Sequence, residues 1–73
     1  MEIKYFTEEI TTMLDGTVAK SITDKETKED AISSALAAYA SAIINANVSK
    51  IHVEAKNNEG FLFESKTWIR ETE

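Results

Sequence analysis

The hydrophobic and polar positions of residues 27–47 repeat with the period of an α-helix. Apolar side chains recur at steps of three and four residues, which places them on one stripe of a helix. The stripe consists of Ile32, Ala35, Leu36, Tyr39, Ile43 and Ala46. Thr27, with Asp30 three residues later, matches a variant of the capping box that begins a helix. Asn47 belongs to a residue type that ends helices in the left-handed conformation. The pattern therefore predicts a helix whose turns occupy 28–46.

Residues 50–70 follow the alternation of two strands joined by a short loop. The apolar positions of the first strand are Ile51, Val53 and Ala55, with polar residues between them. A three-residue loop that ends at Gly60 in the left-handed region fits the sequence NNEG. The matching register sets Ala55 opposite Phe63, Val53 opposite Ser65 and Ile51 opposite Thr67. This register predicts that Trp68 lies on the outer face of the hairpin.

Residues 1–23 carry β-branched side chains on both sides of Asp15 and Gly16. Asp-Gly between such residues is a strong hairpin signal, so we predict an N-terminal hairpin. The alternative for 7–14 is a short helix that starts at Thr7 and ends before Gly16. We favour the hairpin because so short a helix is marginal in isolation.

These elements predict an α+β fold in a single domain, 1–73, with ββαββ order. We expect one four-stranded antiparallel sheet with the single helix packed on one of its faces. The pattern places the elements but does not determine the order of the strands across the sheet.

Composition restricts how a chain of this length can be stabilised. A chain of 73 residues buries only about 60% of the surface that its unfolded form exposes. It contains no cysteine and one histidine, so we expect no disulfide, no zinc site and no cofactor. The remaining sources of stability are good packing and association with a second copy of the chain. We expect a homodimer. Without cysteines, a signal peptide or an apolar spanning segment, the sequence predicts a cytoplasmic protein away from membranes.

The middle of the chain, residues 31–49, contains no charged residue. On the side of the helix away from the apolar stripe, small neutral residues stand where exposed helices usually carry Glu and Lys. We predict that this side mediates self-association; it comprises Ser34, Ala37, Ala38, Ser41, Ala42, Ile44 and Asn45. The alternative is a solvated alanine-serine face. Pairing through an open sheet edge would also produce a dimer.

The outer face of the second hairpin is the candidate surface for a different partner. Its predicted members are Lys50, His52, Lys56, Leu62, Lys66, Trp68 and Arg70. Cations around an aromatic ring are typical of single-stranded nucleic-acid binding. Cross-strand pairing of the lysines with Glu54 and Glu64 is the simpler interpretation. The net charge of −5 also disfavours nucleic acid, while an acidic N-terminal region allows mimicry of nucleic-acid phosphates as a further alternative.

Candidate catalytic groups are few. His52 is the only histidine, and with Ser65 expected on the other face of its hairpin it has no nucleophile within reach. Adjacent carboxylates such as Glu8 and Glu9 diverge in a strand, so they do not form the facing pair that glycoside hydrolysis needs. We therefore expect a non-enzymatic protein that binds another macromolecule, namely an unidentified protein, in a regulatory or accessory role.

Overall fold

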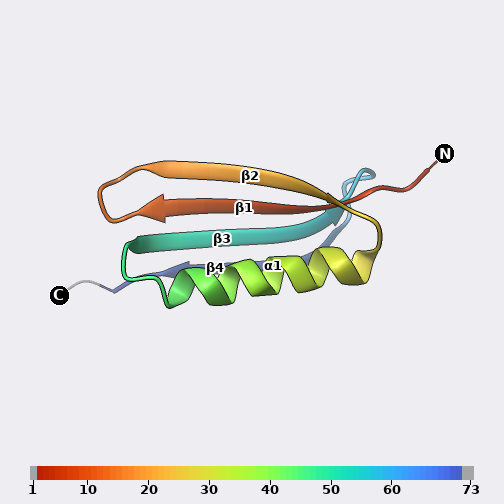
Figure 1. Cartoon of the computed structure of the whole chain (residues 1–73). Coiled ribbons are helices and arrows are strands. Elements are labelled where there is room, and N and C mark those ends of the chain that lie inside the picture. The colour runs from red at the N-terminus through yellow and green to blue at the C-terminus, as the bar shows by residue number, and fades with distance from the viewer. Residues whose placement is uncertain (1, 72–73) are drawn as a thin grey trace.

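The structure, a computed structural model, describes residues 2–71 and contains four strands and one helix. They are β1 (Tyr5–Met13), β2 (Val18–Lys25), α1 (Lys28–Ile43), β3 (Val48–Asn57) and β4 (Leu62–Ile69). The strands form one antiparallel sheet, and α1 packs on one face of it (Figure 1). The predicted α+β architecture with ββαββ order is confirmed.

The strand order across the sheet is β2-β1-β3-β4, so β1 and β3 occupy the centre. The pairs β1–β2 and β3–β4 are hairpins, and α1 returns the chain so that β3 can lie beside β1. The helix packs mainly on β3 and touches β2 least, which leaves β2 uncovered at one edge (Figure 1). Every residue of β2 before Lys25 is exposed. The helix therefore covers the central strands β3 and β1 more than the edge strands, and leaves β2 the most open of the four.

The first hairpin closes with a three-residue loop, Leu14 to Gly16. The Met13 N–H donates to the Thr17 carbonyl oxygen at 2.8 Å. Gly16 has a φ of 93°, in the left-handed region that a Cβ disfavours. The predicted N-terminal hairpin is confirmed. The alternative helix over 7–14 is wrong because residues 7–12 pair with β2 and Met13 pairs with Val48 of β3.

The second hairpin repeats this loop geometry. The Asn57 N–H donates to the Phe61 carbonyl oxygen at 3.0 Å. Gly60 has a φ of 88°, which confirms the predicted loop. The Asn57 side chain also accepts hydrogen bonds from the Glu59 and Phe61 N–H groups, so it stabilises the turn from within.

The helix begins as its sequence predicts and ends earlier. The Asp30 N–H donates to Thr27 Oγ1 at 3.0 Å, which is the predicted N-cap. The last helical residue is Ile43 instead of Ala46. Among the described residues only glycines have positive φ, so the left-handed end predicted for Asn47 is wrong. The chain instead leaves the helix through a turn in which the Asn47 N–H donates to the side-chain oxygen of Asn45.

The core between helix and sheet is small and rich in alanine. The buried apolar residues are Ala31, Ala35, Ala42, Val48, Ile51, Val53 and Ala55. Alanine brings the helix backbone close to β3, while the bulkier Leu36 of the predicted stripe is 37% exposed. Thr7, fully buried on β1, donates its hydroxyl to the Ala31 carbonyl oxygen at 2.9 Å and ties the helix to the sheet.

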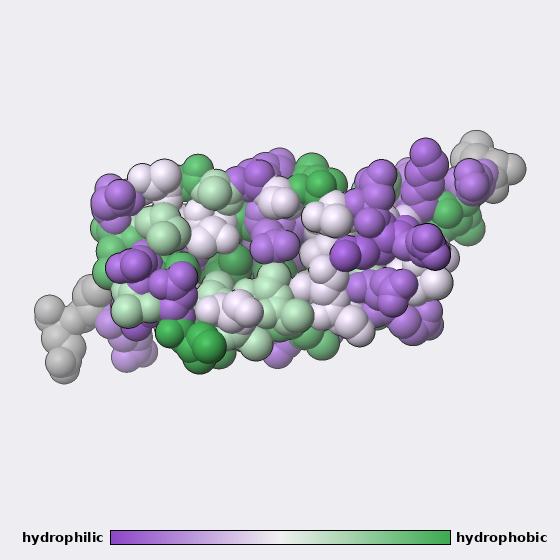
Figure 2. Space-filling view, in the orientation of Figure 1, coloured by the Kyte–Doolittle hydropathy of each residue, from purple (hydrophilic) through white to green (hydrophobic). Residues whose placement is uncertain are grey.

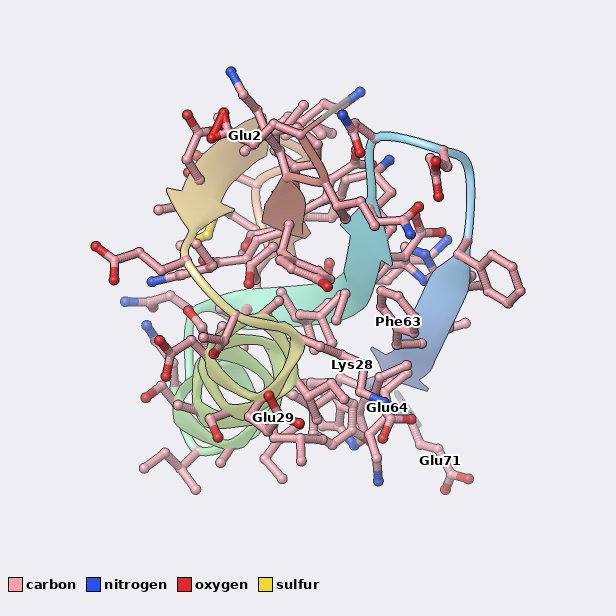
Figure 3. All side chains as sticks on the ribbon, turned by 90° about the vertical axis from the view of Figure 1, so that its right-hand side faces the viewer. Glu2, Lys28, Glu29, Phe63, Glu64 and Glu71 are labelled. Carbon is pink, nitrogen blue, oxygen red and sulfur yellow. The ribbon has the colours of Figure 1, made fainter. Side chains whose placement is uncertain are left out.

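The register predicted for the second hairpin is wrong by one residue over most of its length. Ile51 lies opposite Trp68, Val53 opposite Lys66 and Ala55 opposite Glu64. A bulge shifts the register between Ala55 and Lys56, where Phe63 is the extra residue. The bulge keeps Phe63 near the helix, 6.0 Å from the Tyr5 ring, while the Lys28 ammonium lies 5.5 Å from the Phe63 ring (Figure 3). One bulge therefore lets both Phe63 and Trp68 face the helix.

Candidate functional site

An open groove of about 500 Å³ runs between α1 and β1 on the helix side of the sheet. Its floor includes Glu9, Thr11 and Met13 of β1. Its wall is formed by Ser34, Ala37, Ala38, Ser41, Ala42 and Asn45. Pale side chains of intermediate hydropathy cover the middle of α1, and hydrophilic ones gather where the helix begins (Figure 2). Six of the seven residues predicted for self-association therefore line one groove.

The helix is rotated further toward this groove than the sequence pattern indicates. Ala42 is buried and Ala38 is half-buried against the core. For these two residues the alternative of a solvated alanine-serine face is wrong, because the helix turns small alanines toward the sheet and places the bulky Tyr39 toward β4. The Lys66 ammonium of β4 lies 5.2 Å from the Tyr39 ring. Ile44 lies just beyond the helix and is 83% exposed, outside the groove lining.

Glu9 is the only charged residue in the lining of the groove. It is half-buried on the groove floor, and the ion pairs found within residues 2–71 do not involve it. The rest of the lining consists of aliphatic, thioether, hydroxyl and amide groups. This surface suits a neutral segment of chain that carries one cationic side chain opposite Glu9.

The face of the sheet away from the helix carries a network of charged and polar groups. Glu8, at the centre, is only 8% exposed. Its carboxylate accepts a hydrogen bond from Lys56 Nζ at 2.8 Å, and Lys20 Nζ lies 4.0 Å away. Lys56 Nζ is also 3.6 Å from Glu54. The bond to Glu8 raises the pKa of Lys56, so this lysine is held as a cation between two carboxylates.

The same network continues through the only histidine. His52 Nε2 lies 2.9 Å from a Glu54 oxygen, and His52 Nδ1 lies 2.6 Å from the hydroxyl oxygen of Thr67. Hydrogen bonding to His52 lowers the pKa of Glu54. The order hydroxyl, imidazole, carboxylate is the one that activates nucleophiles in hydrolases. Acyl transfer would also require oxyanion donors aimed at a bound substrate. The groove, which could hold a substrate, lies on the opposite face of the sheet from His52.

The surface predicted for a second partner is divided between the two faces. Lys50, His52, Lys56 and Leu62 are on the open face, as predicted. Trp68 and Lys66 are on the helix side, because they pair with Ile51 and Val53. The Arg70 guanidinium lies 5.0 Å from the Trp68 ring and donates to the carbonyl oxygens of Val48 and Asn45. The prediction of one continuous basic and aromatic face is therefore wrong.

Neither a metal centre nor a spanning helix is found in the part of the chain that the structure describes. No group of three or more His, Cys, Asp or Glu side chains within residues 2–71 is arranged to hold a metal ion. No helix over the same range is long and apolar enough to cross a membrane.

No protein-family model, curated protein or solved structure matches this chain at a significant level. The candidate sites are therefore defined by their own geometry.

Sequence reasoning missed the groove floor and the open-face network. Glu9, Thr11 and Met13 follow the period-two alternation of β1, and this signal would have placed them on one face. The sequence offered no comparable signal for the pairing of His52 with Thr67, because the bulge that brings them together has no glycine or proline to mark it.

Proposed function

We propose that the protein is a non-enzymatic binding protein with a regulatory or accessory role, and that it holds a segment of another protein in the groove beside α1. The observation that supports this best is the neutral wall of the groove, formed by small side chains from three turns of one helix. Small residues allow a partner backbone to approach closely. An ordinary solvated helix carries charged residues at such positions.

The chemistry of the groove favours a particular kind of segment. The lining contains both the methyl groups of Ala37 and Ala38 and the hydroxyl group of Ser41. A partner with small apolar and uncharged polar side chains therefore fits it. Glu9 on the floor favours a Lys or Arg within that segment, since charges of opposite sign at an interface set its register. The occupant is therefore a mostly neutral peptide segment with one basic residue.

Nucleic acid is the less favoured alternative. Lys56 is engaged by Glu8 and Glu54, and Arg70 is engaged by backbone carbonyls. Lys66 lies on the helix side, so Lys50 is the one lysine predicted for this surface that stays on the open face outside the ion pairs found within residues 2–71. Neutralising phosphates supplies most non-specific affinity for nucleic acid. We expect no rise in the fluorescence anisotropy of labelled single-stranded DNA or RNA when the protein is added at low salt; a rise that weakens steeply with salt would favour nucleic acid instead.

The groove is tested with a random peptide library displayed on phage and selected against the immobilised protein. We expect selected peptides to contain a basic residue and to bind Ser41→Glu and Glu9→Gln at least about tenfold more weakly than the unmodified protein. Ala40→Glu is the matched control, because Ala40 is exposed on the same helix but does not line the groove. Failure to select any peptide with this dependence contradicts the proposed function.

A further inference from the structure

Within residues 2–71, no strand pairs with the outer side of β2. Its register with β1 is unbroken from Thr12–Val18 to Tyr5–Lys25. The strand contains neither proline nor glycine, and its residues before Lys25 are exposed. An exposed and regular edge of this kind presents backbone N–H and C=O groups to any strand that can pair with them.

The hydrogen-bond pattern of the hairpin determines which groups of β2 point outward. The Met13 N–H donates to the Thr17 carbonyl, so these residues form a hydrogen-bonded pair. Bonded and non-bonded pairs alternate in an antiparallel ladder, and the odd-numbered residues of β2 therefore bond to β1. The outward-pointing backbone groups belong to Val18, Lys20, Ile22 and Asp24.

We propose that a second copy of this chain pairs with β2 in antiparallel orientation, around a two-fold axis at Ile22. In this register Ile22 of one copy lies opposite Ile22 of the other. Lys20 lies opposite Asp24 of the second copy, and the symmetry repeats this ion pair on the other side of the axis. The side chain of Ile22 is 56% exposed in the single chain, so pairing also covers apolar surface.

The charges of β2 select this register among those that a two-fold axis allows. An axis at Lys20 sets two lysines against each other, and an axis at Asp24 sets two carboxylates against each other. An axis at Ser21 or Thr23 places Ile22 opposite a charged residue. Only the axis at Ile22 places Lys20 opposite Asp24 and, at the same time, Ile22 opposite Ile22 of the second copy. Opposite charges directly across an antiparallel pair are stabilising, and like charges are destabilising.

The other edge of the sheet is less suited to this pairing. The bulge at Phe63 interrupts the register of β4 near its start. The ammonium groups of Lys28 and Lys66 lie over aromatic rings beside this edge, at Phe63 and Tyr39. Bulges are a feature with which natural sheets prevent pairing at an edge. Lysines occur at both edges, since β2 contains Lys20, so the unbroken register of β2 is what makes it the better edge for pairing.

The pairing also changes the surroundings of the groove. A two-fold axis between antiparallel strands is perpendicular to the sheet, so both helices lie on the same face of one eight-stranded sheet. The two grooves then face each other across a floor made of β1 and β2 from both copies. The proposed pairing does not depend on peptide binding, because each groove is formed within one chain.

The first test measures mass by sedimentation equilibrium from about 5 to about 500 μM. We expect a concentration-dependent dimer. Ile22→Pro removes an outward N–H and leaves the ladder to β1 intact, so we expect this variant to remain monomeric. Ser65→Pro is the matched control: Arg70 N–H donates to the Ser49 carbonyl, and the same alternation directs the Ser65 N–H outward at the β4 edge. We expect Ser65→Pro to dimerise normally.

The second test exchanges charges and introduces no proline. Lys20 Nζ also lies 4.0 Å from Glu8, so circular dichroism first checks that Lys20→Glu is folded. Lys20→Glu and Asp24→Lys alone each create two like-charge contacts, so we expect each variant to dimerise about tenfold more weakly. The double variant Lys20→Glu/Asp24→Lys restores both ion pairs and regains the original affinity. A mixture of the two single variants forms a heterodimer, because every contact across the axis then joins opposite charges.

Several outcomes overturn the proposal. They are a monomer at the highest concentration, a dimer that survives Ile22→Pro, or single variants that neither weaken the dimer nor complement each other. Dissociation by Ala40→Glu, with Ile22→Pro without effect, assigns the contact to the exposed helix face. Dissociation by Ser65→Pro assigns it to β4. Peptide selection on the monomeric Ile22→Pro variant tests the groove separately, so failure of one proposal leaves the other measurable.

Discussion

Replacing Lys56 by methionine tests whether the ion pair between Lys56 and Glu8 contributes more to stability than an ion pair fully exposed to water. The change removes the ammonium group that donates to Glu8 and keeps most of the apolar stem in place. The Glu8 side chain is only 10% exposed, whereas the Lys56 side chain is 33% exposed. The two partners therefore differ in how far they are removed from solvent, and this difference determines the expected effect.

The magnitude follows from these exposures and from the distances around Glu8. A hydrogen bond to a charged group contributes about 1.5–3 kcal/mol, and more when the group left behind is buried. Lys20 remains 4.0 Å from the carboxylate and retains part of the attraction. We therefore expect Lys56→Met to lower the free energy of unfolding by about 2 kcal/mol, which corresponds to roughly 8–16 °C in Tm for a domain of this size.

Urea unfolding followed by Trp68 fluorescence and by circular dichroism measures the loss. In the background of Glu8→Gln the same Lys56→Met change is expected to cost about 0.5 kcal/mol, so the double-mutant cycle gives a coupling of about 1.5 kcal/mol. A loss below about 0.5 kcal/mol in both backgrounds would mean that the pair behaves as an ordinary surface ion pair. That result would refute the argument from the burial of Glu8.

Three further predictions concern the core, the loops and the ion pairs. Ala42→Glu places a carboxylate between helix and sheet and is expected to cost more than about 3 kcal/mol in urea unfolding, whereas Ala40→Glu changes stability by less than about 0.5 kcal/mol. Gly16→Ala and Gly60→Ala each meet open space but require a left-handed alanine, so thermal unfolding is expected to show similar losses of about 1 kcal/mol for both. Because the pKa of Glu54 is lowered in the folded protein, its contribution is present above about pH 4.5 and is lost as the pH falls below this value; Glu54→Gln is therefore expected to flatten the acid limb of a stability–pH profile measured by urea midpoints.

The local signals in the sequence predicted the element types and most of their ends. Thr27 and Asp30 gave the helix start, and the two glycine loops gave both hairpins, because capping and left-handed backbone depend on residues close in sequence. These local signals could not predict the order of the strands across the sheet. It depends on which strand joins β1, and that choice is made by packing between distant segments.

The two errors at the candidate sites have a common physical origin. In the helix, alanines occur on nearly every side, so the apolar stripe does not determine which alanines face the sheet; Ala42 and Ala38 are turned inward because small side chains allow close approach. In the second hairpin, the bulge at Phe63 adds one residue without a glycine or proline to mark it. The shift moves Trp68 and Lys66 to the helix side and brings Thr67 to His52.

The central position of β1 has a consequence for how the chain is made. Its partner β3 is distant in sequence: Met13 and Val48 are 35 residues apart, and Tyr5 and Asn57 are 52 apart. At about 5–20 residues per second, the ribosome completes β3 several seconds after β1. During this interval the edge of β1 that pairs with β3 has no partner within the chain, and a two-stranded hairpin by itself is only marginally stable. The topology therefore makes synthesis, and not only assembly, a stage at which strand pairing must be controlled.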